Sequence, residues 1–197
     1  DLNGKQANDT AVRFDAVSFS YSQSSSRILN NISCTIDTGE FVVITGKPGS
    51  GKTTFCRCIN GIIPHALEGE LSGKVTSCGL NTAKVQVQIL AQKVGFVMDD
   101  SDVQIVGRTV FEDVAFGLRN VLVGLDEIHQ RVPRILKMMD LHGFEGRLSH
   151  TLSGGEKQRL AMAGILVMNP QVLVLDEALS ELDPIGRSKV YTLLRDL

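Results

Sequence analysis

The sequence has no tryptophan, only two tyrosines and no long apolar run. Its longest unbroken apolar stretch, 160–168, contains nine residues with a glycine among them, whereas a membrane-spanning helix needs about 20. Any link to a membrane is therefore expected to run through a partner protein. Excess charge is lacking too: 20 Lys and Arg against 22 Asp and Glu give a formal net charge of −2. We therefore expect no nucleic-acid partner, because such binding depends on a basic surface.

Cysteine is also scarce. The four cysteines show no paired C-x-x-C spacing, and a chain of this size needs no disulfides to hold its core. We expect reduced thiols, which are typical of the cytosol. The chain begins with Asp1 and has no charged-then-apolar signal segment, so we expect it to be part of a longer protein.

A length of 197 residues with 43% apolar content predicts one folded domain with a real core. The apolar periodicity switches repeatedly between two and 3.6, which is typical of a mixed α/β chain. The first expected strand has one break in its alternation, where Ala16 is followed by Val17, and Thr109 and Glu112 have the spacing of a capping box that opens a helix. The helix that begins near an N-cap at Asp126 is expected to carry one apolar stripe and to be kinked or split at Pro133. The stripe consists of Ile128, Val132, Ile135 and Met139. Strands are expected over 12–19, 28–36, 41–44, 70–75, 94–97 and 172–175, and helices over 53–60, 109–116, 126–139, 153–168 and 184–197.

Residues 46–53 read GKPGSGKT and fit the pattern G-x-x-x-x-G-K-[ST]. They follow the solid apolar run 41–44, which we expect to be a strand buried on both faces, and precede a helix. In that context the glycines let backbone N–H groups wrap a polyphosphate, while Lys52 adds a positive charge and the Thr53 hydroxyl can bind Mg²⁺. A glycine-rich turn with a surface lysine is the alternative.

Two carboxylates, Asp176 and Glu177, follow the apolar run 172–175. Both acids are expected at the carboxyl edge of the sheet, where ligands of such folds bind. Asp176 would then belong to the Mg²⁺ shell and Glu177 would polarise an attacking water. If this run is considered alone, the alternative is a strand end whose two carboxylates are only solvated by water and have no catalytic role.

The segment 152–159 reads LSGGEKQR and precedes a helix. Ser153 and Glu156 have the spacing of a capping box, which is a purely structural interpretation. Gly154 and Gly155 also leave the N–H groups of the helix end uncovered, which favours a second anion site. We call 46–53 the phosphate loop and 152–159 the signature segment.

Together these motifs resemble the nucleotide-binding domain of the ATP-binding-cassette (ABC) ATPases, and the match covers nearly the whole chain. The resemblance implies an α/β P-loop NTPase fold with a mostly parallel central sheet, an antiparallel β part near the N-terminus and an inserted helical subdomain that carries the signature. It implies one domain over 1–197, with the helical subdomain at roughly 99–163. The family's switch histidine lies on a later strand, so we expect the chain to be truncated before it.

The resemblance also implies site residues. Glu177 is the catalytic residue, and the Mg²⁺ ligands are Thr53, Asp176 and, as a further candidate, Asp99. Tyr21 falls where the family stacks an aromatic ring on adenine, although a core role for it stays open. Residues 180–183 resemble the loop that contacts the partner across a dimer. The full set implied to bind ATP is Tyr21, Gly46, Lys47, Pro48, Gly49, Ser50, Gly51, Lys52, Thr53, Thr54, Ser153, Gly154, Gly155 and Glu156.

More narrowly, the chain is similar to the coupling ATPases of energy-coupling-factor importers for vitamins or transition-metal ions. The stretches that carry this likeness are 94–97, 102–104, 109–117 and 161–164. The implied function is ATP hydrolysis that powers import, through a head-to-tail dimer in which each ATP lies between one copy's phosphate loop and the other copy's signature. The implied partners are a second ABC ATPase domain, the same or homologous, and a transmembrane subunit. The implied location is the cytoplasmic face of the cell membrane.

One departure is Asp99, because the family usually has glutamine after the strand at 94–98. A carboxylate there adds negative charge beside Asp176 and Glu177 and cannot donate a hydrogen bond. This departure favours one alternative, a poorly hydrolysing regulatory half of a fused ABC pair, which the intact Glu177 disfavours. Another alternative is a soluble ABC ATPase outside transport, although the chain lacks the basic extensions and inserted coiled coils typical of that group.

Overall fold

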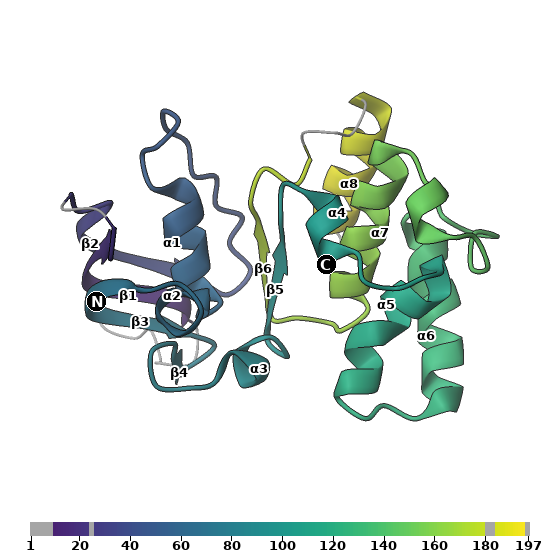
Figure 1. Cartoon of the computed structure of the whole chain (residues 1–197), viewed down its shortest axis with the longest axis horizontal. Helices are drawn as coiled ribbons and strands as arrows, with labels where there is room; N and C mark the ends of the chain where they lie inside the picture. The colour runs from purple at the N-terminus through teal and green to yellow at the C-terminus, as the bar shows by residue number, and fades with distance from the viewer. Residues whose placement is uncertain (1–9, 24–25, 180–183, 196–197) are drawn as a thin grey trace, which may run out of the picture. The chain divides into compact units, whose positions relative to one another are not determined.

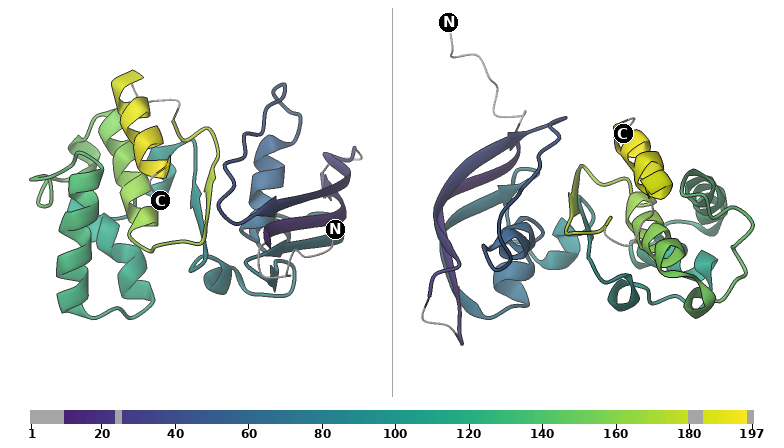
Figure 2. Two further views of the ribbon diagram at one scale, coloured as in Figure 1. Left: turned by 180° about the vertical axis from the view of Figure 1, so that it is seen from behind. Right: turned by 90° about the horizontal axis from the view of Figure 1, so that it is seen from above.

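The computed structural model describes residues 10–23, 26–179 and 184–195. Their contacts divide the chain into two compact units (Figures 1 and 2). The first unit contains the residues up to Gly95 together with 171–174. The second contains 96–170 and the residues from Leu175 onward.

The first unit is built on a four-stranded antiparallel sheet of order β2-β1-β3-β4. Its inward face carries alternate apolar side chains, as a half-buried strand requires. The break in the alternation of β1 is a bulge, because Ala16 has φ 50° and the register shifts between Phe14 and Val17. The strands are β1 (Thr10–Tyr21), β2 (Leu29–Asp37), β3 (Gly69–Ser77) and β4 (Leu80–Asn81).

Helix α1 (Lys52–Ile59) packs on this sheet and is the helix expected after the phosphate loop. The Phe55 ring stacks on the Phe14 ring of β1, with centroids 4.1 Å apart and an interplanar angle of 8°. The Ser77 hydroxyl of β3 donates to the Ile59 carbonyl at 2.7 Å and so ties the helix end to the sheet. Two short helices, α2 (Ile62–His65) and α3 (Val87–Leu90), complete the unit.

The expectation of a buried strand over 41–44 is wrong. These residues form no strand in the structure, and the side chains of Phe41, Val42, Val43 and Ile44 are 69%, 50%, 69% and 41% exposed. An apolar run indicates a preference for burial but does not specify a neighbouring strand, and a strand forms only where its backbone N–H and C=O groups find one.

Strands β5 (Val94–Val97) and β6 (Val172–Leu175) form a separate two-stranded parallel sheet and have the predicted bounds. The Lys93 carbonyl accepts from the N–H of Gln171 at one end of the pair, and the Val97 carbonyl accepts from the N–H of Asp176 at the other. In β6 only Val174 is buried, with 7% of its surface exposed, so this strand is less enclosed than its apolar run suggests.

The second unit is helical, and α7 lies at its centre in contact with α4, α5 and α6 (Figure 2). Four consecutive side chains of α7, from Leu160 to Ala163, are at most 1% exposed. The capping box expected at Thr109 and Glu112 is present and begins α5. The elements are α4 (Ser101–Gln104), α5 (Val110–Asn120), α6 (Leu125–Met138), a 3₁₀ turn (Ser149–Thr151), α7 (Gly154–Leu166) and α8 (Pro184–Arg195).

Two expectations about α6 are wrong. Its N-cap is Gly124 rather than Asp126, which lies in the first turn where its charge complements the helix dipole. The helix also runs through Pro133 without a break. Its predicted apolar stripe is buried, and packing of that stripe against α5 and α7 offsets the hydrogen bond that proline cannot make.

Asp113 is a buried carboxylate that holds the loop between α4 and α5. Its Oδ1 accepts from the backbone N–H groups of Val106 and Gly107, both at 2.8 Å, and the residue is 7% exposed. Burial raises the pKa of Asp113, while these two hydrogen bonds act in the opposite direction. A Cβ atom at Gly107 would lie 2.2 Å from the backbone N of Asp113, so only glycine fits there.

Replacing Asp113 with alanine is expected to lower the free energy of unfolding by about 2 kcal/mol, because two N–H groups would lose their acceptor. Urea unfolding followed by circular dichroism measures the loss. Asp126→Ala, at an exposed carboxylate of α6, is the control and should cost less than about 1 kcal/mol. Equal effects of the two changes would contradict the role given to Asp113.

The four cysteines, all within the described residues, form no disulfide, as expected, and burial raises the pKa of Cys58 to about 12. Among the residues that the structure describes, no helix combines the length and the apolar character needed to cross a membrane.

Candidate nucleotide-binding site

The phosphate loop leads directly into the N-terminus of α1. Gly51 is the N-cap of that helix and has φ 93°, a left-handed conformation that side chains rarely adopt. A Cβ atom there would also lie 3.0 Å from the Ile28 carbonyl oxygen and 3.1 Å from Ile28 Cγ2. The chain therefore needs glycine at this position to turn from the loop into the helix.

Lys52 folds back over the phosphate loop. Its Nζ donates to the carbonyl oxygens of Gly46 at 3.1 Å and Lys47 at 3.4 Å, and residues 46–50 are exposed. The loop thus presents backbone, a helix N-terminus and the ammonium groups of Lys47 and Lys52 within a few residues. This combination suits a polyphosphate, which needs positive charge and N–H donors together.

Tyr21 lies at the end of β1 and contacts the helix that follows the phosphate loop. Its hydroxyl is 3.0 Å from the Thr54 Oγ1, and its ring packs edge-on against Phe19 with centroids 4.9 Å apart. The structure therefore brings Tyr21 to the phosphate-loop helix, although 33 positions separate it from Thr54. No spacing rule in the sequence predicts this contact.

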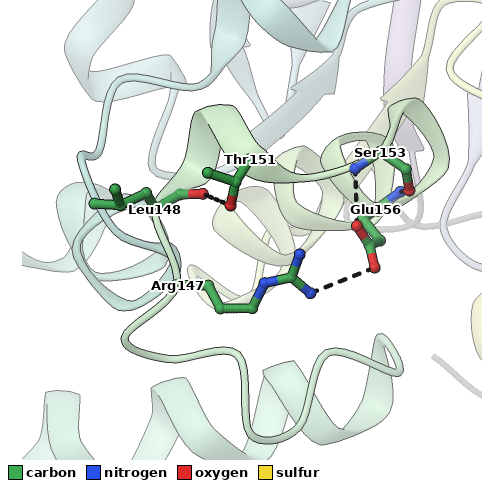
Figure 3. A network of polar contacts seen from close by, with 5 residues as sticks. All are labelled: Arg147, Leu148, Thr151, Ser153 and Glu156. Carbon is green, nitrogen blue, oxygen red and sulfur yellow. Dashed lines mark hydrogen bonds and ion pairs between the residues drawn. The ribbon is translucent and has the colours of Figure 1, made fainter.

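In the signature segment, the capping box at Ser153 and Glu156 is fully formed (Figure 3). The Ser153 N–H donates to Glu156 Oε2 at 2.8 Å, and the Glu156 N–H donates to the Ser153 hydroxyl at 3.4 Å. Gly154 is the first residue of α7 and is exposed, and Gly155 follows it. The first turn of α7 is thus ordered while its glycines leave the backbone uncovered.

Arg147 approaches this capping box from the preceding loop. Its Nη1 is 3.6 Å from Glu156 Oε1 (Figure 3). Its guanidinium lies over the Phe144 ring, 4.2 Å from the centroid. The hydrogen bond from the Ser153 N–H lowers the pKa of Glu156 most, and the charges of Arg147 and Arg159 add to this. Sequence reasoning missed Arg147, since nothing in its spacing marks it.

The two acids differ in their surroundings. Asp176 follows β6, is 8% exposed and donates its backbone N–H to the Val97 carbonyl at 3.0 Å. Glu177 is exposed and has φ 55°. The chain therefore turns sharply after β6 and presents the second carboxylate to solvent.

Asp99 is exposed and accepts from the Asp100 N–H at 2.8 Å. The Met98 carbonyl beside it accepts from the side-chain amide of Gln158 on α7 at 3.3 Å. An ion pair of 2.6 Å between Lys157 and Asp102 joins α7 to α4. The loop that carries Asp99 is thus attached to the signature helix.

The predicted residues fall into the two units. Tyr21 and the whole phosphate loop with Thr54 belong to the first unit, whereas Asp99, the signature segment, Asp176 and Glu177 belong to the second. The loop 180–183 lies outside the described residues. Within the described ranges, no group of three or more His, Cys, Asp or Glu side chains could hold a metal ion.

Comparison with known proteins identifies the family. A sequence model described as ABC transporter matches residues 29–180. Putative ABC transporter ATP-binding proteins of Pyrococcus abyssi and Pyrococcus horikoshii are 45% and 46% identical to this chain over 184 residues, or 93% of it. One from Vibrio vulnificus is 41% identical over 94% of the chain.

The chain spans 66% and 65% of the length of the two Pyrococcus proteins and 32% of the Vibrio protein. The solved structure of CbiO1 from Clostridium perfringens, described as part of the ABC transporter complex CbiONQ, matches with a TM-score of 0.80 and 33% identity. That match covers 95% of this chain and 73% of CbiO1. The chain therefore belongs to the ABC transporter family and has the fold of that family's ATPase domain.

Proposed function

We propose that this chain binds and hydrolyses ATP to power an importer of the energy-coupling-factor type, for a vitamin or a transition-metal ion. The observation that carries the proposal is the presence of two exposed, phosphate-type helix ends in one chain, at α1 and at α7. The likeness to CbiO1, itself part of a transporter complex, supports the importer class.

In this proposal 1–197 is one ABC domain, with its helical subdomain at roughly 99–163, and two such domains, identical or homologous, pair head to tail. The residues from 46 to 54 hold the phosphates of ATP, and Tyr21 stacks on adenine. Ser153, Gly154, Gly155 and Glu156 of the opposite copy meet the terminal phosphate. The pairing of the two domains around ATP acts on a transmembrane subunit. Contact with that subunit locates the protein at the cytoplasmic face of the membrane.

The residues present suit Mg²⁺, which takes one or two protein oxygens and completes its shell with phosphates and water. Thr53 and Asp176 would supply those oxygens, and Asp99 is a further candidate. Bound there, Mg²⁺ neutralises charge on the phosphates. Glu177 polarises the attacking water, and its exposed position leaves room for that water.

The test uses the full-length protein carrying Glu177→Gln, which is expected to retain ATP. Sedimentation with and without Mg-ATP should show a monomer that becomes a dimer only when Mg-ATP is present. A protein that binds no ATP would overturn the proposal. A monomer that binds ATP would instead require a different partner half, with Asp99 as the first residue to exchange.

Lys52→Ala is expected to abolish measurable ATP binding, because Lys52 is the loop lysine that stands at the N-terminus of α1, where the phosphates are proposed to bind. Calorimetric titration with Mg-ATP measures the effect. Lys74→Ala on β3 removes an exposed lysine from the same unit and should leave the affinity within about twofold. Normal affinity of the Lys52 variant would refute the phosphate-binding role of the loop.

A further inference from the structure

Glu156 brings an electrostatic conflict to the signature segment. Its carboxylate caps the Ser153 N–H at 2.8 Å and so lies at the N-terminus of α7, where an incoming phosphate would also bind. A second negative charge at such a site opposes anion binding unless a cation compensates for it. The Glu156 side chain is 22% exposed, so solvent screens its charge only in part.

Arg147 is placed to compensate. Glu156 Oε2 binds the Ser153 N–H, and the other oxygen, Oε1, faces Arg147 Nη1 at 3.6 Å (Figure 3). The two contacts use different oxygens, so neither displaces the other. Arg147 therefore neutralises the carboxylate without removing it from the helix cap.

The position of Arg147 is itself constrained. Its backbone N–H donates to the Phe144 carbonyl at 2.8 Å, its carbonyl accepts from the Val110 N–H at 3.0 Å, and its guanidinium stacks on the Phe144 ring. A stacked guanidinium loses less freedom on pairing than a mobile one, so this pair is better defined than most surface ion pairs.

We propose that Arg147 is a positioning residue for the signature segment, whose charge offsets that of Glu156 so that the capped end of α7 accepts a nucleotide phosphate. This inference rests on the proposed function. It differs from a purely structural role, in which Arg147 only holds its loop to α5 through the backbone and the Phe144 ring.

Removal of the charge on Glu156 separates the two roles. Glu156→Gln keeps a carbonyl oxygen for the Ser153 N–H but carries no charge. If Arg147 acts by neutralising Glu156, it becomes dispensable once residue 156 is glutamine. If Arg147 acts only by holding its loop, its loss has the same effect in both backgrounds.

The experiment measures the Mg-ATP concentration that gives half-maximal dimer by sedimentation, in full-length protein that carries Glu177→Gln. Arg147→Gln should raise this concentration about tenfold when residue 156 is glutamate, and less than about twofold when it is glutamine. The tenfold difference should shrink between about 0.05 and 0.5 M NaCl, because salt screens partly exposed charges. Melting temperature and ATP affinity of the monomer confirm that each variant folds.

Arg131→Gln is the matched control. Arg131 pairs with Glu127 on α6 and is 41% exposed, against 40% for Arg147. Its loss should leave the dimerisation concentration within about twofold. The inference is overturned, and the proposed function is left standing, if Arg147→Gln has the same effect on the dimerisation concentration with glutamate and with glutamine at position 156. The same holds if Arg147→Gln has no effect when residue 156 is glutamate. An Arg147-containing parent that binds no ATP overturns the proposed function and this inference with it, and a parent that binds ATP without forming a homodimer is measured with its different partner half added.

Discussion

Replacing Glu177 with glutamine is expected to stop ATP turnover while leaving ATP binding intact. The substitution removes the charge that would polarise the attacking water, but it leaves the phosphate loop, in the other unit of the chain, unchanged. A general base contributes about 10² to 10⁴ in rate, so kcat should fall by at least about 100-fold.

Steady-state phosphate release and calorimetric ATP titration on the full-length protein measure the two quantities separately. Glu127→Gln, at an exposed glutamate on α6, is the control and should preserve kcat. If Glu177→Gln retains more than about a tenth of the turnover, Glu177 is not the general base. If ATP affinity falls instead, the effect lies in binding rather than in the chemical step.

The Gly154→Asp variant is expected to bind ATP as a monomer but to form no dimer. Gly154 is exposed at the first position of α7, so an aspartate there places a carboxylate where, in the proposed dimer, the partner's terminal phosphate would lie. The monomer's affinity should stay within about twofold, because the phosphate loop is unchanged, while dimer formation and turnover are lost.

The control for this change is Gly124→Asp. Gly124 is the N-cap of α6 with φ −63°, and an added Cβ atom would meet nothing within 4 Å, so it accepts the same side chain in the same unit without strain. This control should dimerise normally. If Gly154→Asp also dimerises and hydrolyses ATP normally, the signature segment is only a helix cap.

Local signals in the sequence predicted much of this fold. Both capping boxes, at Thr109 and at Ser153, depend on residues three positions apart, and both are present. The strands at 94–97 and 172–175 have the bounds that their apolar runs predict. The broken alternation at Ala16 appears as a bulge. In each case the information lies within a few residues of the chain.

Features that depend on distant residues were not predicted. The run 41–44 has the composition of a buried strand, but its pairing partner cannot be determined from its own residues. The contact between Tyr21 and Thr54 arises only when β1 and α1 fold together. Similarly, Arg147 reaches Glu156 because a loop is held to α5, and neither residue alone indicates that the other is near.

If the end of α7 binds a nucleotide phosphate as proposed, its completed capping box also affects the thermodynamics of that binding. Because the Ser153 and Glu156 N–H groups already have acceptors, the first turn of the helix is ordered before any phosphate arrives. Docking of a phosphate there then orders little additional backbone, an entropic cost that would otherwise be about 1–2 kcal/mol per residue. A preformed helix end of this kind favours rapid association and a small unfavourable entropy, with affinity determined mainly by charge.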